Sequence, residues 1–223
     1  FVAALLVDAS KVTIRGLKFP GYAYPNTRYF PIARFDMSLC DLRVEQCLFV
    51  GDENASHLQV GVMAHGDGVI ADHCIFYNVR NSVVFWMSAG GRVKKGNGIT
   101  NSIIYGSTQS GVWTAAPDSG FVFKNNIVAN CLHFWIKNGN NPTVYSIENC
   151  FISNNTNYLA IPVDDDKMNT EGFEIREYNV QKEGVLLLRP KGKATHYDLP
   201  IDYLHPIPGS PGYELGAGLF KSR

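Results

Sequence analysis

Hydrophobic and polar residues alternate in a short phrase that appears six times along the first two thirds of the chain. It reads KVTIRGLKF at 11–19, DLRVEQCLF at 41–49 and GVIADHCIF at 68–76, then GITNSII at 98–104, FVFKNNIV at 121–128 and VYSIENCFI at 144–152. Aligned on residues 17, 47, 74, 102, 126 and 150, the copies are 30, 27, 28, 24 and 24 residues apart. A loose period of this length is typical of one supersecondary unit stacked on copies of itself.

The alternation within each copy predicts a β-strand with one buried face. The position just before the aligned residue holds Asn101, Asn125 and Asn149 in three successive copies. Asparagine tolerates the left-handed backbone of a tight bend, and stacked amides can bond to one another at strand spacing. The column therefore predicts a ladder of asparagines along one corner of a stack.

A second strand is expected before each copy, at 3–7, 32–36, 60–64, 83–87, 111–114 and 133–136. No stretch of the chain shows convincing helical periodicity. Over about residues 1–160, the coil repeat and the asparagine ladder resemble the right-handed parallel β-helix of the pectate-lyase-like superfamily, as found in secreted bacterial proteins. The resemblance implies an all-β fold, a right-handed parallel β-helix of about six coils spaced about 4.8 Å apart.

The repeat weakens near Tyr158, which predicts coils over 1–157 and an irregular C-terminal cap over 158–223. We expect the cap to cover an open end of the stack, where backbone groups and core side chains are otherwise exposed. Within the cap, 184–189 (GVLLLR) is interpreted as a strand. Phe1 falls almost directly into a coil, without the usual N-terminal cap, so we expect the chain to be part of a longer protein.

The composition of the chain argues against several classes of function. The chain has 20 basic and 20 acidic residues, which argues against a nucleic-acid partner, and no apolar run is long enough for a membrane span. The five cysteines fit no closed disulfide framework, and no pair has zinc-finger spacing. Cys47, Cys74 and Cys150 fall in the inward column and are interpreted as small buried hydrophobes. A secreted, periplasmic or cell-surface location is implied by the resemblance.

The second strands carry the most informative chemistry. We align these strands on one inward residue each: Phe35, Val62, Phe85, Val112 and Phe134. The residue after each then points outward, which gives the column Asp36, Met63, Trp86, Trp113 and Trp135. All three tryptophans of the chain fall in this column. A stripe of exposed indoles is costly unless it has a function. We predict a platform on which a polysaccharide stacks. The alternative is an interface covered by the C-terminal segment, another domain or another subunit.

Polar residues flank this stripe, and the resemblance implies that substrate clefts often follow such a sheet. A uronate lyase needs a base, a proton donor and a cation that neutralises the carboxylate. Lys137, His65 and Arg34 have this chemistry, Asp36 is placed to assist them, and His133 lies beside Trp135. Calcium would be a cofactor of such a lyase, although no dedicated metal site is predicted. The run Asp164–Asp166 offers oxygen ligands but cannot converge on one ion.

A hydrolase would instead need two carboxyl groups facing one bond, with Asp36, Asp67 and Asp72 as the nearest candidates. Basic groups outnumber carboxylate pairs on this face, so β-elimination is favoured over hydrolysis. The leading hypothesis is a secreted carbohydrate-active protein that binds and cleaves a polysaccharide. The alternatives are a non-catalytic glycan-binding or adhesin module, and a scaffold fragment of a larger protein.

Overall fold

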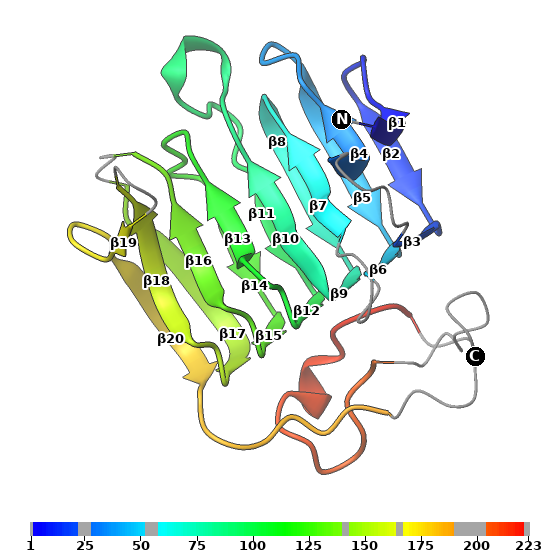
Figure 1. Ribbon diagram of the computed structural model, residues 1–223, viewed down its shortest axis with the longest axis vertical. Helices are drawn as coiled ribbons and strands as arrows, with labels where there is room; N and C mark the ends of the chain where they lie inside the picture. The colour runs from blue at the N-terminus through cyan, green and yellow to red at the C-terminus, as the bar shows by residue number, and fades with distance from the viewer. Residues whose placement is uncertain are drawn as a thin grey trace.

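A computed structural model of the chain describes residues 2–21, 28–51, 58–139, 143–163, 167–189 and 204–220. Short strands wind in stacked parallel coils of about six turns (Figure 1). The described residues contain no helix longer than the three-residue 3₁₀ turns at Ala89–Gly91 and Tyr213–Leu215. The predicted all-β parallel β-helix is therefore confirmed.

One side of the stack is an eight-stranded sheet built from the second strands. Seven strands are parallel, because each coil returns to the sheet in the same direction, and the eighth pairs antiparallel with the seventh. In spatial order they are β1 (Val2–Leu6), β4 (Tyr29–Arg34), β7 (Leu58–Ala64), β10 (Val79–Phe85), β13 (Ser110–Thr114), β16 (His133–Lys137), β18 (Asn157–Pro162) and β19 (Met168–Asn169).

The repeated phrase forms two rows of strands that meet at a corner. One row is β2 (Val12–Arg15), β5 (Cys40–Glu45), β8 (Asp67–Asp72), β11 (Gly98–Thr100) and β14 (Val122–Lys124). The other is β3 (Lys18–Pro20), β6 (Leu48–Val50), β9 (Ile75–Tyr77), β12 (Ile103–Tyr105) and β15 (Ile127–Ala129). The long strand β17 (Tyr145–Ser153) pairs with both rows and with β20 (Ile175–Gln181), which makes a sheet of twelve strands.

The predicted ladder occupies the corner between these rows. Its six positions all have a left-handed backbone with φ between 48° and 73°: Gly16, Gln46, His73, Asn101, Asn125 and Asn149. The amide of Asn125 donates to Oδ1 of Asn101 at 2.9 Å, and the amide of Asn179 donates to Oδ1 of Asn149 at 2.7 Å. The asparagine ladder is confirmed, and β20 extends it by one residue.

Inward columns of side chains fill the coils. The rings of Phe19, Phe49 and Phe76 stack with centroids 5.0 Å and 4.6 Å apart. Cys47 and Cys74 are free and buried beside them, as expected, with their thiols on backbone carbonyl oxygens. The core thus repeats from coil to coil in register.

The coil pairing continues beyond residue 157, where the sequence was expected to leave the stack. β18 pairs in parallel with β16, and β20 pairs in parallel with β17. Of the residues expected to form the C-terminal cap, 158–181 include two strands that continue the coils at the end of the stack, whereas the described residues from Leu186 onward pack along a side. There Leu204 and Ala217 pack against the outward faces of Leu48, Ile103 and Ile127.

The same segment is fixed to the corner by backbone hydrogen bonds. The Gly218 N–H donates to the Asn101 carbonyl at 2.8 Å, and the Phe220 N–H donates to Oε1 of Gln46 at 2.8 Å. The strand predicted at 184–189 is wrong. These residues form only an isolated bridge between Leu188 and Pro206, because Leu186 and Leu188 pack onto the coils and leave no neighbouring strand to pair with.

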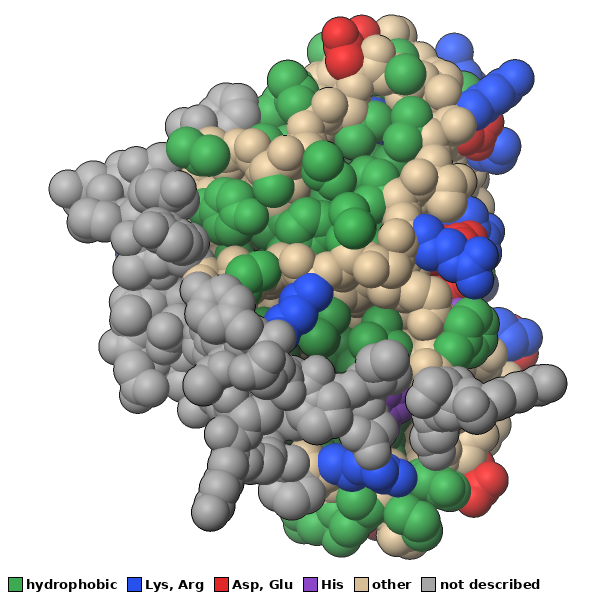
Figure 2. All heavy atoms as spheres, turned by 90° about the vertical axis from the view of Figure 1, so that its right-hand side faces the viewer, with side chains coloured by type: hydrophobic (Ala, Val, Ile, Leu, Met, Phe, Trp, Pro, Cys, Tyr) green, Lys and Arg blue, Asp and Glu red, His purple; other side chains and the backbone are tan. Residues whose placement is uncertain are grey.

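Figure 2 views the end of the stack at which β1, β2 and β3 lie. Hydrophobic side chains gather across the upper middle of this end, and basic side chains lie along one edge and also within the face below the hydrophobic area. The described part of the C-terminal segment lies at the side of the stack, below β3, β6 and β9 in Figure 1.

Candidate functional site

The strands of the eight-stranded sheet bend in the middle, and the bend decides which side chains face outward. At the bend, the pairing of β7, β10, β13 and β16 skips the position occupied by Gly61, Ser82, Gly111 and Phe134, respectively. A Cβ added at Gly61 would lie 2.9 Å from the Phe76 ring, and one at Gly111 would lie 3.2 Å from the Val128 side chain. These positions therefore point into the core.

The next position in each strand also points inward. Val62, Val83, Val112 and Trp135 occupy one register column, and all four are fully buried in the core. Two consecutive inward residues break the period-two alternation of an ordinary strand. The outward column is consequently Met63, Val84, Trp113 and Ile136.

The predicted stripe of three tryptophans is therefore wrong for Trp135. Its ring packs among aromatic core residues, with centroids 4.9 Å from Tyr145 and 5.1 Å from Phe121. Its indole N–H donates to Oγ1 of Thr114 at 3.0 Å. Phe134 and Trp135 both point inward at the bend. Strict alternation from an inward Phe134 therefore assigns Trp135 to the outer face, which is incorrect.

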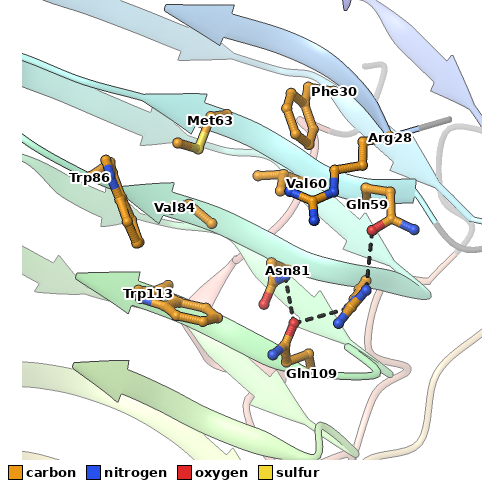
Figure 3. A pocket seen from close by; sticks show the side chains of 11 residues that line it. Arg28, Phe30, Gln59, Val60, Met63, Asn81, Val84, Trp86, Gln109 and Trp113 are labelled. Carbon is orange, nitrogen blue, oxygen red and sulfur yellow. Dashed lines mark hydrogen bonds between the residues drawn. The ribbon is translucent and has the colours of Figure 1, made fainter. Parts of the chain in front are cut away.

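Trp86 and Trp113 do face outward, on neighbouring coils. Their ring centroids are 6.1 Å apart and the rings are tilted by 56°. They form one end of a groove of about 330 Å³ on the outer face of β7, β10 and β13 (Figure 3). Phe30, Val60, Met63 and Val84 supply the rest of its apolar lining.

Polar groups line the other end of the groove. Arg80 donates from Nε to Oε1 of Gln109 at 3.0 Å and from Nη1 to Oε1 of Gln59 at 3.4 Å. The amide of Asn81 donates to the same Gln109 oxygen at 3.0 Å. This network holds the Arg80 guanidinium in place, and Arg28 also lines the groove (Figure 3).

The charge of the groove is positive. Its lining contains two guanidinium groups, those of Arg28 and Arg80, and no carboxylate among the described residues. The indole N–H of Trp113 is buried and has no hydrogen-bond partner among the described residues. The groove thus combines aromatic faces, amides and cations, a combination suited to an anionic ligand with apolar ring faces.

The sequence missed most of this polar end. Gln59, Arg80 and Gln109 fall in register on three neighbouring strands, one position before Val60, Asn81 and Ser110. The sequence contains these three long polar residues, but they form a column only when the strands are aligned on the residues that precede the bend. The aromatic end was found because tryptophan is rare and conspicuous.

Two of the predicted catalytic residues point into the coils. Arg34 is fully buried and donates from Nε to the His65 carbonyl at 2.7 Å and from Nη2 to the Asp67 carbonyl at 3.1 Å. Burial lowers the pKa of its guanidinium below the usual value. Lys137 is also buried, with Nζ 5.7 Å from the centroid of the Phe173 ring. The expectation that both side chains face outward is wrong. The two consecutive inward residues at the bend shift the alternation by one position, so both side chains point inward.

The other three predicted residues are not gathered around the groove. Asp36 is exposed and accepts hydrogen bonds from the Ser38 hydroxyl and N–H, which lower the pKa of its carboxyl. His65 is half-buried beside Phe35, and burial together with Arg34 lowers the pKa of its imidazole. Burial likewise lowers the pKa of His133. None of the five lines the groove.

The carboxylates considered for a hydrolase accept hydrogen bonds from neighbouring groups and lie outside the groove. Asp67 accepts hydrogen bonds from the Ser88 hydroxyl and the Lys94 N–H. Burial would raise the pKa of Asp72, but hydrogen bonds from Asn101 and Thr100 bring it below its usual value. Neither lines the groove.

Asp118 is a buried carboxyl that the sequence reasoning missed. It accepts the N–H groups of Asn97 at 2.8 Å and Gly120 at 3.1 Å, and burial raises its pKa to about 6. Asn97 in turn accepts the Val69 N–H at 2.8 Å, so side-chain oxygens link three successive coils. The Asp-Ser-Gly turn at 118–120 was the available signal. Its contacts give Asp118 a structural role.

Within the described ranges, no group of three or more His, Cys, Asp or Glu side chains is arranged to hold a metal ion. The aspartates at 164–166, considered as calcium ligands, lie outside those ranges. The same part of the chain contains no helix that is long and apolar enough to cross a membrane.

Comparison with known proteins agrees with the fold. The family model described as right handed beta helix region matches residues 42–181, and the match ends at the last residue of β20. The chain belongs to this family of right-handed β-helix proteins. No curated protein and no solved structure matches it significantly.

Proposed function

We propose that the protein binds a polysaccharide in the groove between Trp86, Trp113 and Arg80. The observation that carries this proposal is the pair of outward indoles at one end of a groove whose other end is a network of amides and guanidinium groups. Pyranose rings offer apolar C–H faces to indoles and hydroxyl groups to amides. Concave sites of this kind, apolar with a few fixed polar groups, are the usual form of a ligand site.

The groove favours a sugar that carries a negative charge. Arg80 is already oriented by Gln59 and Gln109, so little side-chain freedom is lost when it binds a carboxylate or sulfate. No carboxylate among the described lining residues opposes such a group. Uronic or sulfated polymers are therefore the expected ligands, in a protein that is secreted or displayed at a cell surface.

Binding without cleavage is favoured over β-elimination. A lyase needs its base and its neutralising cation at the bound sugar. Arg34 and Lys137 point into the coils, and His65, His133 and Asp36 do not line the groove. Cleavage remains the second candidate function, and an unsaturated product from a bound uronic polymer is the observation that would establish it.

A polysaccharide panel tests the proposal. Neutral, uronic and sulfated polymers are titrated against the wild-type protein, Trp113→Ala and Tyr178→Ala, whose side chain is an exposed aromatic on β20, remote from the groove. We expect an acidic polymer to bind the wild type and Tyr178→Ala equally, and Trp113→Ala at least about tenfold more weakly. Equal binding by all three proteins, or no binding by any, contradicts the proposal.

The same samples distinguish binding from cleavage. Ultraviolet absorbance of unsaturated uronate together with new reducing ends establishes a lyase. New reducing ends alone establish a hydrolase. Binding without either product supports the non-catalytic form of the proposal.

A further inference from the structure

The residues that line the groove on β7, β10 and β13 fall into two register columns. The polar column contains Gln59, Arg80 and Gln109. The aromatic column lies four residues later in each strand and contains Met63, Val84 and Trp113. Four residues of strand span at most about 13 Å, which is farther than a single pyranose ring extends. One sugar therefore cannot contact both columns, and different sugars of a bound chain must occupy them.

The polar column carries the positive charge of the groove. Arg80 is held there by hydrogen bonds to Gln59 and Gln109. Arg28, which directly precedes β4, also lines the groove, and in Figure 3 it lies on the side of Gln59, away from the two tryptophans. Guanidinium groups bind carboxylates and sulfates through paired charge-assisted hydrogen bonds. This end of the groove therefore favours an acidic sugar.

The aromatic column is uncharged. Met63 and Val84 line it together with the rings of Trp86 and Trp113, and no charged side chain among the described lining residues lies in this column. The face of an indole is negative and repels an anion. A charge removed from water without a partner is also costly. The apolar C–H face of an uncharged sugar meets neither penalty, so this end favours a neutral sugar.

We propose that the groove selects a polysaccharide in which acidic sugars are separated by uncharged ones. An acidic sugar lies at Arg80, and an uncharged sugar of the same chain stacks on Trp86 and Trp113. This inference rests on the proposed binding function and specifies its ligand class. A uronic homopolymer places carboxylates at both ends of the groove, whereas a neutral polymer leaves Arg80 without an anionic partner. The groove volume of about 330 Å³ is at the lower end for ligand sites and suits a short segment of such a chain.

The affinities of the wild-type protein for polymers of different charge pattern test this inference. Polygalacturonate is charged on every sugar and dextran on none, whereas gellan and hyaluronan carry glucuronate separated by uncharged sugars. Binding is measured at about 0.15 M salt, where attraction between distant charges is screened. We expect the tighter of the two mixed polymers to bind at least about tenfold more tightly than polygalacturonate or dextran.

A cation placed in the aromatic column should weaken this preference. Met63 is half-buried and faces the groove, so Met63→Lys supplies an ammonium group where the wild type has none. Polygalacturonate should then gain affinity, and the preference for the mixed polymer should fall about threefold. Tyr178→Lys adds the same charge to an exposed residue of β20, remote from the groove, and should leave the preference unchanged. Circular dichroism establishes that each variant is folded.

The outcomes distinguish this inference from the proposed function. Polygalacturonate or dextran binding the wild type as tightly as both mixed polymers overturns the inference. An unchanged preference in folded Met63→Lys also overturns it. Neither result contradicts polysaccharide binding in the groove, provided that Trp113→Ala still weakens it. A wild-type protein that binds no polymer contradicts the proposed function, and this inference fails with it.

Discussion

The indole of Trp113 faces the groove, whereas the indole of Trp135 in the next coil is buried in the core and donates to Thr114. Their sequence contexts are similar, since each follows an apolar residue in a short strand. The difference arises from the bend, which turns both Phe134 and Trp135 inward. The bend therefore separates a tryptophan that lines the groove from one that packs in the core.

Substitution at the two tryptophans should therefore have opposite consequences. Trp135→Ala removes a fully buried ring and should lower the free energy of unfolding by about 3–5 kcal/mol. Trp113→Ala changes a half-buried surface residue and should cost about 1 kcal/mol or less. Chemical denaturation measures both values. Equal losses would contradict the assigned directions of the two rings.

Arg34 should behave as a structural residue. Arg34→Met leaves the His65 and Asp67 carbonyls without their guanidinium donors, so we expect a loss of about 2–4 kcal/mol in the free energy of unfolding. Arg80→Met is the matched control, because Arg80 is exposed and lines the groove. It should weaken ligand binding with little change in stability. An Arg34→Met protein of wild-type stability would contradict the buried role of this residue.

Asp118 should make the fold less stable as pH rises from about 4 to about 6. Its pKa in the folded protein is raised to about 6 by burial, so in this range the folded state holds a proton that the unfolded chain has released. The contribution is at most about 3 kcal/mol. Asp118→Asn should flatten this part of the stability profile, as measured by urea denaturation at several pH values.

Asp36→Asn serves as the control for that profile. The pKa of Asp36 is lowered by Ser38, so this carboxyl contributes with the opposite sign, and its removal should retain the fall between about pH 4 and 6. A fall that persists unchanged in Asp118→Asn would refute the assignment to Asp118.

The asparagine ladder should be sensitive to both its hydrogen bonds and its backbone conformation. Asn125 has φ of 55° and donates to Asn101. Asn125→Ala loses the bond and places an alanine in the left-handed region, at a combined cost of about 2 kcal/mol. Asn125→Gly loses only the bond and should cost less. Thermal denaturation that ranks the glycine variant below the alanine variant would contradict this account.

Much of the fold was predictable because its signals are periodic. The inward columns at Phe19, Phe49 and Phe76 and the ladder at Asn101 and Asn125 repeat at fixed positions, so six weak copies reinforce one another. The bend has no such signal. Ser82 and Val83, or Phe134 and Trp135, are adjacent residues that both point inward, and a period-two pattern assigns them to opposite faces.

The candidate site was predictable only in part for the same reason. The outward direction of Trp86 and Trp113 was predicted correctly because they directly follow the inward residues Phe85 and Val112. Arg34 and Lys137 share the inward column with Phe85, and a charged residue in such a column resembles a surface residue in the sequence. Their burial depends on carbonyl and aromatic partners that only the coil stacking brings close.

The most direct test of the central claim is the affinity of an acidic polysaccharide for the wild type, Trp86→Ala, Trp113→Ala and the double variant. Because the two rings lie against each other and form one end of the groove, each single substitution should weaken binding at least about tenfold. The double variant should lose less than the two single losses combined, since either change already disrupts the shared surface. Wild-type affinity in both single variants would contradict the assignment of this groove as the binding site.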